Sequence, residues 1–179
     1  IEGSAAKAYF SVFPQLILRN AQDFPFSGRS RRPPLDPVNA MLSFAYTLLG
    51  NEIAGALESV GLDPAVGFLH TLRPGRASLA LDLLEELRAP LADRFVLSQI
   101  NLGAITRKDF AQKENGAYYL TDDTRRAFLA AWQKRKQEPL THPFLKEKIV
   151  WGLVPYTQAM LLARYLRGDL DACPPFLWK

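Results

Sequence analysis

Apolar positions recur at intervals of three and four residues along most of the chain, and this spacing predicts a mainly helical protein. The first such stripe covers residues 1–20, where Pro14 predicts a kink or a new helix start. Residues 21–36 are rich in Pro, Gly, Ser and Arg and predict a loop. The expected fold is all-α, a single helical domain of six or seven helices over residues 1–179.

Two Asp-Pro pairs predict helix starts, because Asp is a good N-cap and Pro is tolerated in the first helical turn. Asp36-Pro37 opens a helix that carries a long apolar stripe and ends at Gly61. Asp63-Pro64 predicts a second, short helix that runs to His70.

The later segments alternate between helical and extended patterns. Ser78 is the predicted cap of a leucine-rich helix that Pro90 bends, and residues 110–121 favour a small hairpin or an extended crossing. Helices are expected from Thr121 to about residue 138 and over residues 141–167, the second interrupted at Pro155. Residues 174–178 predict an extended tail with docking aromatic side chains.

Composition limits the class of protein. A chain of 179 residues can bury one sizeable core, and no apolar run is long enough to predict a membrane span. The single cysteine, Cys173, excludes an internal disulfide framework and a Cys-rich zinc site. The net charge of +4 favours anionic partners, and arginines gather in the loop at Arg29, Arg31 and Arg32.

The candidate chemistry lies in residues 70–88. This stretch holds His70, the carboxylates Asp82 and Glu85, and the arginines Arg73 and Arg76. An imidazole with carboxylates suits a divalent cation, and neighbouring guanidinium groups suit a phosphate. On a helix, Asp82 and Glu85 share one face. The pattern therefore indicates metal-assisted attack on a phosphodiester.

Spacing alone leaves another interpretation open. Asp82 or Glu85 can form an ordinary ion pair with Arg88 on an exposed acidic face. His70 can equally be a half-buried structural histidine, and His142, which precedes Pro143, favours a structural role.

Three longer segments of the sequence resemble a known family. Residues 36–49 (Asp-Pro-Val-Asn-Ala-Met-Leu-Ser-Phe-Ala-Tyr-Thr-Leu-Leu), 61–70 and 78–88 together resemble the CRISPR-associated spacer-acquisition integrase and endonuclease family, Cas1. Residues 1–6 resemble the glutamate motif of that family. Residues 163–179 resemble the C-terminus of class 1 members such as subtype I-C. The resemblance covers the whole chain.

The resemblance implies a set of site residues. Glu2, His70 and Glu85 match the catalytic metal ligands, Asp82 matches a supporting acidic position that ligates through water, and the ion is Mg²⁺ or Mn²⁺. Arg73 and Arg88 match basic positions near the DNA backbone. Arg76 is expected to join them, and Arg29, Arg31 and Arg32 to make further backbone contacts. Asn39 matches a recurring position to which no role is assigned.

The resemblance also implies a setting. The family joins a small N-terminal β domain to a helical catalytic domain, and only the helical part is expected here, as a fragment of a longer protein. Its reaction inserts spacers into a CRISPR array through attack by a 3′-hydroxyl. Expected partners are prespacer and repeat DNA, a second copy in the full-length protein, the small dimeric subunit Cas2 and a Cas4-type nuclease, all in the prokaryotic cytoplasm and without a membrane.

Two alternatives belong to other classes of protein. One is a catalytically silent helical module that binds DNA or acts as a scaffold. The other is a protein-interaction module that uses Phe176 and Trp178 as anchors.

Overall fold

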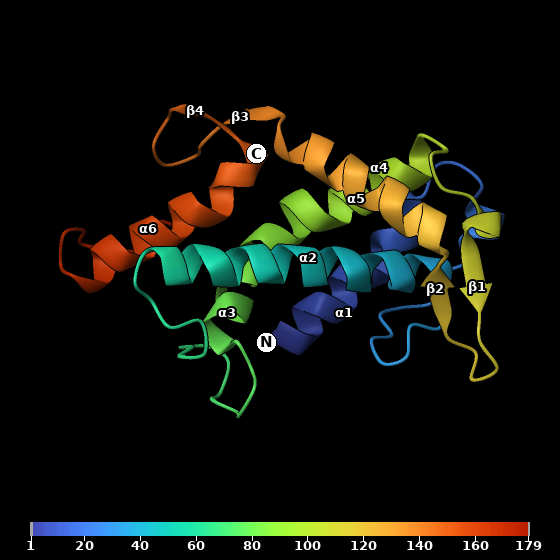
Figure 1. Cartoon of the computed structure of the whole chain (residues 1–179), viewed down its shortest axis with the longest axis horizontal. Coiled ribbons are helices and arrows are strands. Elements are labelled where there is room, and N and C mark those ends of the chain that lie inside the picture. The colour runs from blue at the N-terminus through green and yellow to red at the C-terminus, as the bar shows by residue number, and fades with distance from the viewer. Residues whose placement is uncertain (1, 179) are drawn as a thin grey trace. The chain divides into compact units, whose positions relative to one another are not determined.

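The computed structural model describes residues 2–178, without the side chain of Glu2, and the described residues are mainly helical, as predicted (Figure 1). The α-helices are α1 (Glu2–Val12), α2 (Pro37–Ser59), α3 (Ser78–Leu87), α4 (Arg94–Asn101), α5 (Asp122–Lys136) and α6 (Val154–Leu166). The strands are β1 (Phe110–Gln112), β2 (Tyr118–Leu120), β3 (Pro139–Thr141) and β4 (Lys148–Val150). Short 3-10 helices cover Phe13–Leu16, Ala21–Asp23, Arg107–Asp109 and Trp151–Leu153.

The chain divides into two compact units. Unit 1 comprises Ile1–Ala45 and Asp93–Ala131, and unit 2 comprises Tyr46–Ala92 and Trp132–Lys179. Each unit has its own core. Buried side chains of unit 1 include Phe13, Phe24, Phe95 and Phe128, and those of unit 2 include Leu57, Leu87, Trp132 and Trp151.

The helix predicted at Asp36-Pro37 is confirmed. Asp36 Oδ1 accepts the N–H of Asn39 at 2.7 Å, which satisfies a backbone donor that has no partner inside α2. At the other end Gly61 adopts a φ of +82°, and the N–H of Leu62 returns to the carbonyl of Leu57 at 2.9 Å. A left-handed residue at this place is the usual way to end a helix, and glycine adopts it without strain.

The short helix predicted over residues 64–70 is wrong. Asp63 instead closes a turn, since its Oδ1 accepts the N–H of Ala65 at 2.8 Å. The N–H groups of Phe68, Leu69 and His70 donate to a side chain of α3 rather than to carbonyls one turn earlier. The Ser78 cap is also wrong, because the buried Ser78 hydroxyl donates to the carbonyl of Thr71 and makes no capping bond.

The long helix predicted over residues 141–167 is wrong in its first half. β3 and β4 pair there as an antiparallel hairpin, and α6 starts only at Val154. His142 holds the hairpin turn, because its Nδ1 accepts the N–H groups of Phe144 and Leu145 while its Nε2 lies 3.1 Å from Gln158 Oε1. Its structural role is therefore confirmed. Pro155 lies in the first turn of α6 and interrupts nothing.

Three other expectations are confirmed. Residues 110–121 form the hairpin β1–β2, and Pro90 lies in a π-helical turn over Arg88–Asp93. The aromatic tail docks inside unit 2: the Phe176 ring lies 5.9 Å from the Trp151 ring, and the Trp178 ring lies 5.2 Å from it. Among the described residues, no helix has the length and apolar character needed to cross a membrane.

Candidate active site

Helix α3 brings the predicted site residues of unit 2 together. Its leucines, including Leu83 and Leu87, are buried, and this packing fixes the helix. Asp82 lies among them with a fully buried side chain. A buried carboxylate is costly unless hydrogen bonds replace its water, so the partners of Asp82 decide what it does.

Four donors occupy the Asp82 carboxylate. Oδ2 accepts the backbone N–H groups of Phe68 and Leu69 at 2.7 and 3.0 Å. Oδ1 accepts the N–H of His70 at 2.9 Å and lies 2.6 Å from His70 Nδ1. A single side chain of α3 therefore fixes the backbone and the imidazole of the His70 loop.

These bonds also determine the charge of Asp82. Burial alone would raise the pKa of this carboxyl, but hydrogen bonds from the Leu69 backbone, the His70 ring, and the Phe68 and His70 backbones outweigh it and hold the pKa below its ordinary value. Asp82 is therefore an ionised acceptor at neutral pH.

The charge of Asp82 fixes the orientation of His70. An ionised carboxylate can only accept, so His70 Nδ1 must carry the proton that lies between them. In a neutral imidazole this leaves the lone pair on Nε2, for which the described residues, with the Glu2 side chain set aside, provide no hydrogen-bond donor. The His70 side chain is 20% exposed. A histidine held in this way by a carboxylate is the arrangement that proteins use for metal-ligating imidazoles.

Gly67 permits the approach of the His70 loop to α3. A Cβ at this position would lie 2.7 Å from Ser78 Cβ and 2.8 Å from Asp82 Oδ2. Any side chain would push the loop away from the carboxylate. The backbone N–H of Leu79 adds a further tie to the carbonyl of Pro64 at 2.8 Å.

Glu85 lies one turn after Asp82 and forms an ion pair with Arg88. The pair is partly buried, with 28% of the Glu85 side chain and 15% of the Arg88 side chain exposed, and the Arg88 guanidinium lies 5.1 Å from the centroid of the Tyr46 ring. The structure thus contains the ion pair that the alternative interpretation of the spacing required, while His70 and Asp82 are joined as well.

Glu86 serves another purpose. Its Oε2 accepts the side-chain amide of Gln158 at 2.8 Å and the backbone N–H of Phe176 at 3.2 Å. This carboxylate therefore attaches α6 and the aromatic tail to α3, and does so at the residue that follows Glu85.

The basic residues differ in exposure. Arg73, Arg31 and Arg32 are exposed and Arg76 is half-buried, so all four can meet phosphate. Arg29 is turned inward: its guanidinium donates to Asn39 Oδ1 at 2.6 Å and to Ser43 Oγ at 3.0 Å. The structure uses Arg29 to hold the loop of residues 25–36 rather than to face solvent.

Asn39 explains how that loop is built. The Oδ1 of its buried amide accepts hydrogen bonds from the Arg29 guanidinium and the N–H of Ser30. The Nδ2 of the same amide donates to the carbonyl of Gly28 and to Asp36 Oδ2. Burial is the main reason that the pKa of Asp36 is raised, although bonds from Asn39 oppose the shift. The recurring asparagine thus has a structural role in unit 1.

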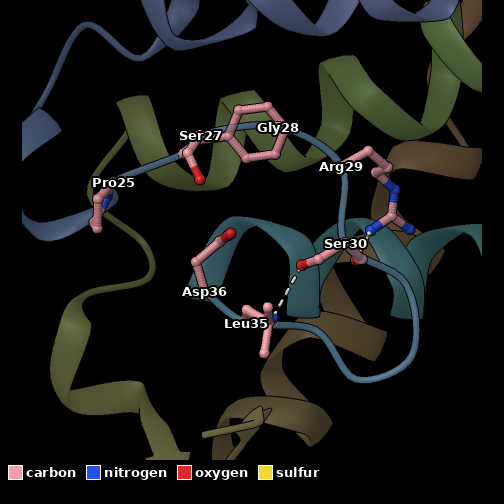
Figure 2. Close-up of a pocket in the computed structure, with 8 residues that line it drawn as sticks. Pro25, Ser27, Gly28, Arg29, Ser30, Leu35 and Asp36 are labelled. Carbon is pink, nitrogen blue, oxygen red and sulfur yellow. Dashed lines mark hydrogen bonds between the residues drawn. The ribbon is translucent and has the colours of Figure 1, made fainter.

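An open hollow of about 570 Å³ lies along this loop (Figure 2). Pro25, Ser27, Arg29, Ser30 and Asp36 are among its lining residues, and Ser30 Oγ accepts the N–H of Leu35 at 3.0 Å. Of the predicted metal ligands, His70, Asp82 and Glu85 are not among its lining residues.

The described residues fit the predicted metal site in part. His70 offers Nε2 with a fixed tautomer, and Glu85 offers a partly exposed carboxylate. The side chain of Glu2, the third predicted ligand, lies outside the described residues. Within the part of the chain that the structure describes, no group of three His, Cys, Asp or Glu side chains is gathered for a metal.

Two residues of the site were missed from the sequence. Gly67 carries no signal of its own in one sequence, since its importance comes from an approach to α3. Thr71 joins through its carbonyl, which any residue would supply. By contrast, the donors on Phe68 and Leu69 were hidden by the helical pattern of residues 64–70.

Comparison with known proteins places this chain in a family. The family model described as "CRISPR associated protein Cas1" matches residues 1–134. "CRISPR-associated endonuclease Cas1 2" of Rhodospirillum rubrum is 61% identical over 178 residues, which are 99% of this chain and 52% of that protein. A "CRISPR-associated exonuclease Cas4/endonuclease Cas1 fusion" of Geobacter sulfurreducens is 44% identical over 100% of this chain and 32% of its own length. The chain spans about half the length of the first of these relatives.

Solved structures of similar proteins have the same fold. A "Casposase bound to integration product" superposes with a TM-score of 0.85 at 32% identity, over 96% of this chain and 47% of that one. A chain of a "Cas6-RT-Cas1--Cas2 complex" superposes with a TM-score of 0.81 at 30% identity, over 99% of this chain and 19% of its own.

Proposed function

Because this chain belongs to the CRISPR-associated Cas1 family, we propose that it is the helical catalytic part of a metal-dependent DNA integrase and endonuclease. In this proposal the full-length protein inserts new spacers into a CRISPR array by attack of a 3′-hydroxyl on a phosphodiester. The observation that carries the proposal is the hydrogen bond between Asp82 and His70, which orients the imidazole and leaves the lone pair on Nε2 to bind a metal.

Glu2, His70 and Glu85 would hold the ion, Mg²⁺ or Mn²⁺. When bound, such an ion polarises a phosphodiester and lowers the pKa of an attacking hydroxyl. Oxygen-only surroundings suit Mg²⁺ best, so an imidazole in the set favours Mn²⁺. Asp82 acts as the positioning residue, since its two oxygens are already occupied by the His70 loop.

The protein's own side chains supply the remaining chemistry. Arg88 holds the Glu85 carboxylate in place through their ion pair. Arg73 follows His70 by three residues on an exposed loop, where its guanidinium can bind a DNA phosphate. Arg76 adds a second guanidinium. No protein nucleophile is needed, because the substrate carries the attacking hydroxyl.

The partners follow from the same membership. The Cas4/Cas1 fusion and the Cas1–Cas2 complex contain chains similar to this one, and they support a Cas4-type nuclease and the dimeric subunit Cas2 as partners. The casposase bound to its product supports DNA as the substrate. We propose the homodimer on family grounds alone.

Mn²⁺-dependent strand transfer and cleavage of branched DNA by the full-length protein test the proposal. We expect His70→Ala and Glu85→Ala to abolish both reactions while DNA binding persists. Glu114→Ala, which changes an exposed carboxylate of the β1–β2 hairpin, is the matched control and should react normally. An inert wild type, or active His70→Ala and Glu85→Ala variants, would refute it.

One observation favours a second candidate, a catalytically silent helical module that binds DNA. Glu85 already has Arg88 as its partner, and a carboxylate engaged in this way has less need of a cation. Addition of Mn²⁺ separates the two candidates. A silent module would neither bind the ion with higher affinity than Glu85→Gln nor cleave DNA in its presence.

A further inference from the structure

The loop that carries His70 exposes an unusual amount of apolar surface. Between α2 and α3, Val66, Phe68, Leu69 and Leu72 are 58%, 65%, 68% and 65% exposed. Figure 1 shows this segment as a green trace that extends beyond the start of α3. Single exposed apolar residues are common, but four within seven positions form a patch that marks an interaction site.

The patch is presented by a fixed backbone. Asp82 accepts the N–H groups of Phe68 and Leu69, so two of the four exposed side chains belong to residues whose main chain is held. The Ser78 hydroxyl holds the carbonyl of Thr71, next to Leu72. The apolar groups therefore face outward on a loop that is anchored at both sides of His70, and they lose little backbone freedom when a ligand covers them.

The surroundings of the patch determine its chemistry. The exposed Arg73 follows Leu72 directly, and Arg76 lies on the same loop. Apolar side chains beside guanidinium groups match a ligand that alternates flat apolar faces with negative charges. Nucleic acid has this alternation of bases and phosphates, and proteins insert Phe and Leu between base steps while arginines bind the backbone.

We propose that Phe68, Leu69 and Leu72 form a wedge that inserts between DNA bases at the reacting phosphodiester. Arg73 and Arg76 hold the phosphates on either side of the opened step. This inference rests on the proposed function, because it assumes that DNA reaches His70, and it adds a determinant of substrate choice. Separating stacked bases is cheapest where the duplex is already interrupted, so the wedge selects branched DNA and strand ends over continuous duplex.

The test uses 2-aminopurine, whose fluorescence rises when it leaves the base stack. The probe replaces the base next to the branch in one DNA and a base far from the branch in another, and the full-length protein is added in EDTA so that no reaction occurs. Wild type should raise fluorescence only beside the branch. Phe68→Ala and Leu69→Ala should lose this rise and should bind branched DNA about tenfold more weakly, with little change for duplex.

Leu166→Ala is the matched control, since Leu166 is 61% exposed on α6 of the same unit. It should behave as wild type. Unchanged fluorescence in Phe68→Ala and Leu69→Ala would overturn the wedge. So would a change in their oligomeric state on size-exclusion chromatography, because the patch would then be a protein interface.

The fluorescence experiment tests the wedge independently of the proposed integrase activity. Fluorescence in EDTA reports binding alone, so a protein that opens the branch but never reacts keeps the wedge and refutes the integrase. A protein that reacts while both variants retain the wild-type signal keeps the integrase and refutes the wedge.

Discussion

Asp82 Oδ1 lies 2.6 Å from His70 Nδ1, and the same carboxylate binds three backbone N–H groups of the loop that carries the histidine. This relationship makes Asp82 the residue through which α3 determines both where His70 lies and which of its nitrogens is protonated. The following predictions begin from it.

Asp82→Asn should weaken Mn²⁺ binding by about 10- to 100-fold, the effect expected when the partner of a metal-ligating histidine is lost. The amide nitrogen would also face a donor, which costs about 1–3 kcal/mol of unfolding free energy. Calorimetric titration and thermal melting measure the two effects. Asp63→Asn, in the same loop but exposed, is the control and should change neither by much.

The contribution of Asp82 to stability should depend on pH. Its pKa is lower in the folded protein than its ordinary value of 3.8, so the stabilisation is complete above that value and is lost as the pH falls through the folded pKa. Urea unfolding should therefore separate wild type from Asp82→Asn widely at neutral pH and progressively less in acid, below the ordinary value. An equal separation at all pH values would contradict the assignment.

Gly67→Ala should destabilise unit 2 by about 1–3 kcal/mol, because the added Cβ meets Ser78 and Asp82 at under 3.0 Å. Gly55→Ala is the opposite case, since a Cβ there has nothing within 4 Å and the residue lies inside α2. It should stabilise by up to about 1 kcal/mol. Thermal denaturation of both variants separates the effect of the close contact between Gly67 and α3 from the general effect of an added methyl group.

The loop arginines should divide into two groups in DNA binding. Arg31→Ala and Arg32→Ala should each reduce the slope of log K against log salt by about 1, since each exposed guanidinium releases about one counterion. Arg29→Ala should mainly lower the melting temperature, because its guanidinium holds Asn39 and Ser43. A large change in the salt slope for Arg29→Ala, with normal stability, would show that it contacts phosphate instead.

Phe176→Ala should cost about 3–5 kcal/mol of stability, as expected for a buried aromatic ring that packs on Trp151 and His142. Leu177→Ala should be close to neutral, since that side chain is 72% exposed. Chemical denaturation of both variants tests whether the tail completes unit 2 or is held in reserve for another protein.

Local signals account for what the sequence predicted correctly. Asp36-Pro37 begins α2 and Gly61 ends it because capping involves neighbours in the chain, and the same holds for the hairpin at residues 110–121. The helix predicted over residues 64–70 is absent because the N–H groups of residues 68–70 bind Asp82, which lies up to 14 positions away. Residues 141–153 failed because strand pairing and the bond between His142 and Gln158 override a helical pattern.

The candidate site was predictable as a set of residue types but not as a geometry. Spacing identified His70, Asp82 and Glu85, but it gave no indication that the Asp82 oxygens accept hydrogen bonds from the His70 loop. It also left the pairing of Glu85 with Arg88 open. The exposed apolar side chains of residues 66–72 gave no signal, because in sequence they were indistinguishable from the buried face of a helix.

The hydrogen bond from Phe176 to Glu86 joins residues 90 positions apart. At about 5–20 residues per second, a ribosome needs roughly 5–20 s to make the chain between them. During that interval the leucines of α3 have been synthesised, while the segment that donates to Glu86 has not. A nascent chain therefore presents unfinished apolar surface beside Glu85, and chaperones have their best opportunity to bind it before residue 176 emerges.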